Sequence, residues 1–157
     1  MRGQHWNEVY RAHPSDAVSW YQDEPALSLR LLDAAGLEPT TRVIDVGGGD
    51  SRLVDALVTR RLTHITVLDI SGAALARARA RLGQASSHVT WIEADVTDAA
   101  WQIDPVDIWH DRAVFHFLID SDDRARYVAP ARATIVASGA LVIGTFAQWC
   151  RFRLEQG

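Results

Sequence analysis

The chain has no lysine: all 16 basic residues among its 157 are arginine. This absence excludes a lysine general base, a lysine Schiff base and the phosphate-binding lysine of a Walker-type P-loop. Cysteine is almost absent as well, since Cys150 stands alone and cannot form an internal disulfide. The longest apolar run, residues 135–147, is interrupted by glycine and polar residues and is too short to span a bilayer.

Positive charge is also in short supply, with a formal net charge of -4. This balance argues against general binding to nucleic acids or anionic membranes, because such proteins usually carry a positive surface. Residues 1–10 lack the apolar stretch of a secretory signal. We therefore expect a cytoplasmic protein with no nucleic-acid or membrane partner. The length and the 48% hydrophobic content predict one globular domain over residues 1–157.

Short β-branched segments alternate with amphipathic helical segments along the chain. Turn residues bound five expected strands, at 42–46, 64–68, 89–92, 106–109 and 140–146. Helices are expected at about 25–35, 51–60, 71–82 and 122–137, with Pro130 kinking or splitting the last one. Parallel strands need crossovers of a dozen or more residues, so this order predicts an α/β fold. The expected architecture is a three-layer Rossmann-like sandwich, a mostly parallel sheet with helices on both faces.

Three glycines, Gly47, Gly48 and Gly49, follow the first expected strand. In an open parallel sheet, ligands bind beyond the carboxyl ends of the strands, near the point where strand order reverses. Glycines at this turn let a ligand approach backbone N–H groups with no Cβ in the way. A dinucleotide fingerprint read from Gly47 would place Arg52 at its third glycine position, which counts against NAD and FAD.

Two aspartates follow at the ends of the next two expected strands. Asp69 is placed where a carboxylate can accept both hydroxyls of a ribose, and Asp95 where it can meet an adenine amino group. Taken singly, each feature also fits a tight turn or a helix cap. Their order, at successive strand ends on one edge of the sheet, favours a cofactor site.

The segments 43–51, 67–71 and 94–96 resemble successive motifs of class I methyltransferases that depend on S-adenosyl-L-methionine (SAM). The likeness covers roughly residues 4–147. It implies a methyltransferase that converts SAM to S-adenosyl-L-homocysteine (SAH), and no metal site is predicted. By the resemblance, Asp45 and the glycines hold the methionine part, Asp69 the ribose, and Asp95 with Val96 the adenine. The full set of expected cofactor-binding residues is Trp20, Tyr21, Asp45, Gly47, Gly48, Gly49, Asp69, Ile70, Asp95, Val96 and His110.

The N-terminal segment carries a second part of the resemblance. Residues 5–10 and 19–22 are similar to the opening of bacterial methyltransferases in which an aromatic pair closes over the cofactor. The resemblance therefore implies that residues 1–24 form an N-terminal lid, with Trp20 and Tyr21 over the ligand.

Residues 110–118 follow the fourth expected strand and resemble the fourth motif of those bacterial enzymes. Methyl transfer chiefly needs alignment and exclusion of water, with a base only where the acceptor carries a proton. Asp111 or His110 could be that catalytic base. Alternatively, Asp111 and Arg112 pair with each other or with neighbours, and His116 is a core residue.

The tail is shorter than the resemblance implies. The family normally carries two more strands after the fifth, whereas 11 residues follow Phe146 here and 148–153 looks like the terminal strand. We expect strands six and seven to be reduced, with 148–157 as a shortened C-terminal strand. An unpaired edge invites association, so the chain is expected to be a monomer or a homodimer through that edge.

Two functions stay open at this point, because the missing region often shapes the acceptor pocket. The first is a SAM-dependent methyltransferase acting on a small molecule or a protein side chain. The second is a methyltransferase-like module that binds SAM or SAH with little or no catalysis.

Overall fold

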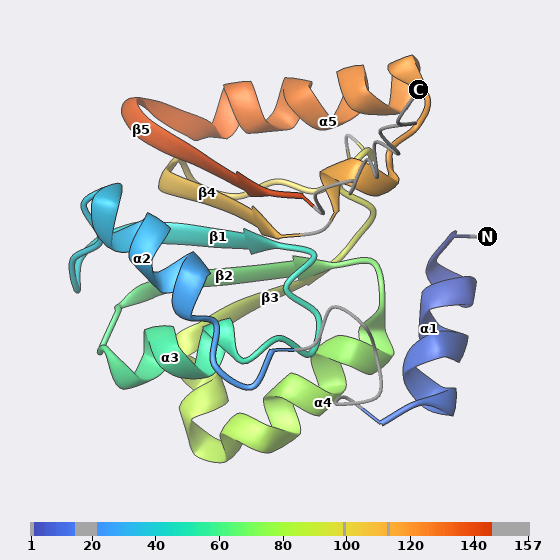
Figure 1. Ribbon diagram of the computed structural model, residues 1–157, viewed down its shortest axis with the longest axis horizontal. Helices are drawn as coiled ribbons and strands as arrows, with labels where there is room; N and C mark the ends of the chain where they lie inside the picture. The colour runs from blue at the N-terminus through green and yellow to red at the C-terminus, as the bar shows by residue number, and fades with distance from the viewer. Residues whose placement is uncertain (1, 15–21, 99, 113, 146–157) are drawn as a thin grey trace, which may run out of the picture.

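The computed structural model describes residues 2–14, 22–98, 100–112 and 114–145. Five parallel strands form one sheet in the order β3-β2-β1-β4-β5 (Figure 1). The strands are β1 (Arg42–Val46), β2 (His64–Asp69), β3 (Val89–Glu93), β4 (Val106–Arg112) and β5 (Ile135–Gly144). Strand order reverses between β1 and β4, which places the switch point at the carboxyl ends of these two strands. The predicted α/β fold is confirmed.

Helices cover both faces of the sheet (Figure 1). They are α2 (Ala26–Ala34), α3 (Leu53–Thr59) and α4 (Gly72–Leu82) on one face, and α5 (Ser121–Thr134) on the other. A helical turn, η2 (Gly83–His88), follows α4, and a second, η3 (Phe115–Phe117), precedes α5. Ser71 caps α4, because its hydroxyl accepts the Ala74 backbone N–H at 3.2 Å.

Alternation along the strands divides the core in two. Val43 and Ile108 belong to the cluster under α2, α3 and α4, whereas Ile44 and Trp109 belong to the cluster under α5. Successive side chains of β1 and β4 therefore reach opposite layers. The three-layer arrangement follows from this alternation.

The fourth and fifth strands differ from their predicted limits. β4 continues through Arg112, so residues 110–112 lie within the strand and not after it. Its last residues pair with β1 on one side and β5 on the other, as in the register of Asp111 with Val46 and Ile143. The fifth strand begins at Ile135, directly after α5, and not at residue 140.

Pro130 lies inside α5 without splitting it. The helix runs from Ser121 to Thr134, although the proline removes one backbone N–H donor. Tyr127 and Ala131, on either side of Pro130, are 1% and 4% exposed and pack against the sheet. This packing holds the helix in one piece, so the expected split does not occur.

The first helix, α1 (Arg2–Ala12), stands beside the carboxyl edge of the sheet, toward which the strand arrows point (Figure 1). Asn7 joins it to α4, because its side-chain oxygen accepts the Ser71 hydroxyl at 2.8 Å and the Ala73 backbone N–H at 3.0 Å. No helix in the described part of the chain has the length and apolar content to cross a membrane. The predicted terminal strand at 148–157 lies outside the described residues.

Candidate functional site

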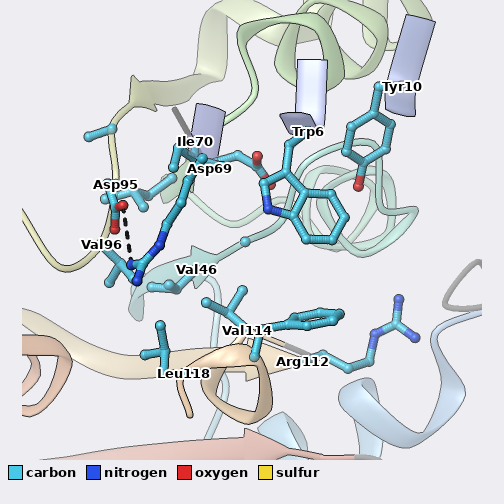
Figure 2. A pocket seen from close by; sticks show the side chains of 15 residues that line it. Trp6, Tyr10, Val46, Asp69, Ile70, Asp95, Val96, Arg112, Val114 and Leu118 are labelled. Atoms are coloured by element: carbon cyan, nitrogen blue, oxygen red, sulfur yellow. Dashed lines mark ion pairs between the residues drawn. The ribbon is translucent and has the colours of Figure 1, made fainter. Parts of the chain in front are cut away.

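A cavity of about 250 Å³ opens at the carboxyl edge of the sheet, between α1 and the strand ends (Figure 2). Five of the predicted cofactor-binding residues line it: Gly47, Asp69, Ile70, Asp95 and Val96. The remaining lining residues are Arg2, Trp6, Tyr10, Val46, Leu68, Ala94, Arg112, Val114, Phe117 and Leu118. The ends of β1, β2 and β3 thus meet at one cavity, as the sequence predicted.

The turn after β1 has room for glycine only. Gly47 and Gly49 have φ values of 67° and 44°, which side chains other than glycine rarely adopt. A Cβ on Gly47 would lie 1.9 Å from a methyl of Val114, and one on Gly48 would lie 2.6 Å from Asp45 Oδ2. Gly47 lines the cavity, while Gly48 and Gly49 shape the turn beneath it.

Arg81 of α4 fixes the end of this turn. Its guanidinium donates to the Ser51 carbonyl at 2.8 Å and to both Asp55 oxygens at 2.8–3.2 Å, and it also pairs with Asp50. Asp50 is 6% exposed. A half-buried, multiply bonded arginine holds the turn more firmly than an exposed ion pair would.

Asp69 is a buried carboxylate at the cavity wall. It is 7% exposed, and burial, together with the nearby Asp45 charge, raises its pKa to about 7. The Ser71 backbone N–H donates to Asp69 Oδ1 at 2.7 Å and opposes this shift. Once ionised, a carboxylate at this place in the wall can accept two hydrogen-bond donors from a ligand.

Asp95 lies at one end of the cavity. Thr97 donates its backbone N–H and its hydroxyl to Asp95 Oδ1, at 2.9 and 2.7 Å. The other oxygen, Oδ2, lies 3.8 Å from Arg2 Nη1, the pair drawn with a dashed line in Figure 2. Arg2 also pairs with Asp123, so it links α1 to the loop after β3 and to α5.

Two predicted cofactor-binding residues lie beneath the glycine turn and not in the cavity wall. Asp45 and His110 are 3% and 2% exposed, and Asp45 Oδ1 lies 2.8 Å from His110 Nδ1. Ser28 of α2 completes the chain, with its Oγ 3.0 Å from His110 Nε2. The Asp45 carboxylate accepts from His110 Nδ1, and the Ser28 hydroxyl is the hydrogen-bond partner of the other ring nitrogen. Cofactor contacts of Asp45 and His110 stay predictions.

Asp111 is fully buried and caps η3. Its Oδ1 accepts the Val114 backbone N–H at 2.8 Å, and its Oδ2 accepts the Phe115 N–H at 3.1 Å and the Tyr127 hydroxyl at 2.5 Å. Burial raises the pKa of Asp111, and burial beside the Asp111 charge raises the pKa of Tyr127. Asp111 and Arg112 do not pair with each other, because neighbouring strand residues point to opposite faces. Asp111 does not line the cavity, and its role as a base stays a prediction.

Residues 43–139 match the family model described as a methyltransferase domain. The chain belongs to this family. Uncharacterized methyltransferases of Mycobacterium tuberculosis and Mycobacterium bovis are each 30% identical to it over 116 residues, which are 74% of this chain and 56% of the relative. The chain thus spans about half the length of the curated relatives it matches. The predicted family resemblance is confirmed.

Solved structures share the fold of this methyltransferase domain. The N-methyltransferase NodS from Bradyrhizobium japonicum, in complex with SAH, has a TM-score of 0.73 at 18% identity, covering 90% of this chain and 71% of NodS. The glycopeptide N-methyltransferase MtfA, complexed with SAM, has a TM-score of 0.65 at 19% identity, covering 78% of this chain and 54% of MtfA. At these identities the likeness shows the common fold.

Ten of the 15 residues that line the cavity of this methyltransferase domain were not among the predicted cofactor-binding residues. Arg2, Trp6 and Tyr10 of α1 line the cavity and lie ahead of the matched segment. Their spacing of four residues, which puts all three on one helix face, was the signal available. Trp6 meets Phe117 edge to face, with ring centroids 5.4 Å apart. The predicted lid pair, Trp20 and Tyr21, lies outside the described residues.

Proposed function

We propose that this methyltransferase domain binds SAM in the cavity and transfers its methyl group to a small-molecule acceptor. The observation that carries the proposal is that Gly47, Asp69 and Asp95, from three successive strand ends, line one cavity at the switch point. The SAM- and SAH-bound structures of MtfA and NodS, which share the fold, support the choice of cofactor.

Asp69 is the proposed partner of the ribose. A buried carboxylate accepts two hydroxyl donors best when it is ionised, and burial places the pKa of Asp69 at about 7. Binding of the ribose then favours the ionised form. SAM affinity should therefore increase as the pH rises through about 7. Ile70, which follows Asp69, lines the same wall.

Asp95 and Val96 are the proposed adenine site. Thr97 occupies Asp95 Oδ1, which leaves Oδ2 to accept from an exocyclic amino group in place of Arg2. Val96 and Leu118 are 5% and 7% exposed and give this end apolar surfaces suited to a flat ring. The methionine part would then extend over Gly47 toward β4.

SAM supplies an electrophilic methyl group on a sulfonium. The acceptor's lone pair forms the new bond to the methyl carbon while the carbon–sulfur bond breaks, and its electron pair stays on the sulfur of SAH. The residues of this chain align the two partners and exclude water, and the apolar wall of Trp6, Val114 and Phe117 suits that task. Where the acceptor carries a proton, His110 and Asp111 remain the proposed bases.

The wider proposal is a single domain over residues 1–157 that acts in the cytoplasm as a monomer or homodimer, with no nucleic-acid or membrane partner. The net charge of -4 and the single cysteine support it. A protein side chain is the alternative acceptor class.

Calorimetric titration of the full chain with SAM, SAH and NADH tests the cofactor assignment. Binding of SAM and SAH without binding of NADH is expected, and no SAM binding at high micromolar concentration would overturn the proposal. An Asp69→Ala variant should bind SAM about 10- to 100-fold more weakly, through loss of charge-assisted hydrogen bonds.

Transfer of radiolabelled methyl from SAM to a panel of amines, thiols and carboxylic acids tests the reaction. SAM binding without transfer to small molecules or proteins would favour a binding module.

A further inference from the structure

Two cations line the cavity, and they lie at opposite ends of it (Figure 2). Arg2 stands at the Asp95 end and is matched by two carboxylates, those of Asp95 and Asp123. Arg112 stands at the other end, where β4 finishes. The two arginines therefore differ in whether the protein neutralises them.

Sheet pairing fixes the position of Arg112. Its neighbour Asp111 is in register with Val46, so Arg112 comes level with the start of the glycine turn, at the switch point. On its other side it is in register with Gly144 of β5. A Cβ on Gly144 would lie 3.4 Å from Arg112 Cγ, so the bare glycine gives the arginine stem a surface to pack on.

No carboxylate in the described part of the chain lies within ion-pair distance of Arg112. The adjacent Asp111 faces the other layer and bonds to Tyr127 and to η3. Arg112 is partly buried, and burying a guanidinium costs solvation free energy that no counter-charge of the described residues offsets. Its planar fork suits two parallel bonds to one carboxylate.

We propose that Arg112 is the anion-binding residue of this site and takes a ligand carboxylate. The neighbouring wall, to which Val114, Phe117 and Trp6 contribute, is apolar and offers no competing cation. Two ligands can present a carboxylate at the switch point. One is the methionine carboxylate of SAM, which rests on the proposed function, and the other is the carboxylate of an acceptor.

The first arm of the test asks whether Arg112 binds the methionine carboxylate of SAM. SAM and decarboxylated SAM, which keeps the sulfonium and the amine, are titrated into wild type, Arg112→Gln and Arg132→Gln. Arg132 is an exposed arginine of α5 outside the cavity and serves as the matched control. If the cofactor is the source, Arg112→Gln weakens SAM about 10- to 100-fold and leaves decarboxylated SAM unchanged.

The second arm asks whether Arg112 binds a carboxylate of the methyl acceptor. Binding of 4-fluorobenzoate and of its neutral counterpart 4-fluorobenzyl alcohol is followed by fluorine NMR, with and without saturating SAH. If the acceptor is the source, wild type and Arg132→Gln bind the benzoate more tightly than the alcohol, and Arg112→Gln loses this preference. Arg112→Lys keeps the charge without the fork and should retain part of it.

Loss of carboxylate preference in either arm supports the proposal and identifies the source. If Arg112→Gln alters neither preference while its melting temperature stays at the wild-type value, the proposal is overturned. Failure of wild type to bind SAM would count against the proposed function alone, because the benzoate titration without SAH still reports on Arg112.

Discussion

Asp45 of β1 and His110 of β4 are a register pair of neighbouring strands, with Oδ1 and Nδ1 2.8 Å apart. Both are nearly fully buried, and Ser28 anchors the far side of the imidazole. The hydrogen-bonded chain of Ser28, His110 and Asp45 joins α2 to β1, the strand that precedes the glycine turn. A buried chain of this kind is stable only while each member keeps its partner.

Breaking this chain should destabilise the fold. Ser28→Ala leaves His110 Nε2 without its hydrogen-bond partner and should lower the free energy of unfolding by about 1 to 3 kcal/mol. His110→Leu leaves a buried carboxylate without its donor and should cost about 3 to 5 kcal/mol. Urea unfolding measures both. Ser87→Ala, at an exposed serine, is the control and should change stability by less than about 0.5 kcal/mol. Equal effects of Ser28→Ala and Ser87→Ala would contradict the assignment.

Asp69 should make the unliganded protein less stable as the pH rises from about 4 to about 7. Its pKa is about 7 when folded against 3.8 as a free side chain, so the folded state binds more protons in this window. The limiting slope is about -1.4 kcal/mol per pH unit. Urea unfolding of wild type and Asp69→Asn at four pH values measures it, since the difference between them isolates Asp69. A difference that does not vary with pH would show that Asp69 titrates normally.

Asp111 should act by holding η3 in place. Asp111→Asn replaces an oxygen acceptor with an amide, and Tyr127→Phe removes one of its three donors. We expect the first to lower stability by about 1 to 3 kcal/mol and the second by about 1 kcal/mol. If η3 positions the apolar wall, both variants weaken SAM binding. A base role instead predicts that Asp111→Asn slows single-turnover methylation, whereas Tyr127→Phe methylates at nearly the wild-type rate. SAM affinity would then stay near wild type in both variants.

Gly47 should tolerate substitution less than Gly36, although both have positive φ, 67° and 87°. A Cβ on Gly36 meets nothing within 4 Å, so Gly36→Ala carries the backbone strain alone, about 1 kcal/mol. Gly47→Ala adds the clash with Val114, so it should cost more stability and also SAM affinity. Thermal melting and calorimetric titration of the two variants make the comparison. Equal melting temperatures would mean that Val114 yields at no cost.

The elements that sequence reasoning found are those with local signals. The periodicity of residues 42–82 and the turn residues that bound it define two strands and two helices without reference to distant contacts. The turn at Gly47, together with Asp69 and Asp95, followed from a general property of parallel sheets, that their strand ends share an edge. These residues do line one cavity.

The parts that were missed depend on distant partners. His110 and Asp111 look like loop residues by composition, and they fit inside β4 because Ser28 and Tyr127 satisfy their polar atoms. The roles of α1 depend on where that helix docks, which its own residues do not specify. Arg2, Trp6 and Tyr10 share one face of α1, and the function of this face follows only from the cavity that it lines.

The cavity wall has two separate origins along the chain: α1 lies ahead of residues 43–139, and the strand ends and η3 lie within them. Exchange of residues 2–12 between relatives would therefore replace one side of the pocket and leave the glycine turn intact. Such chimeras could change ligand preference by replacing α1 alone.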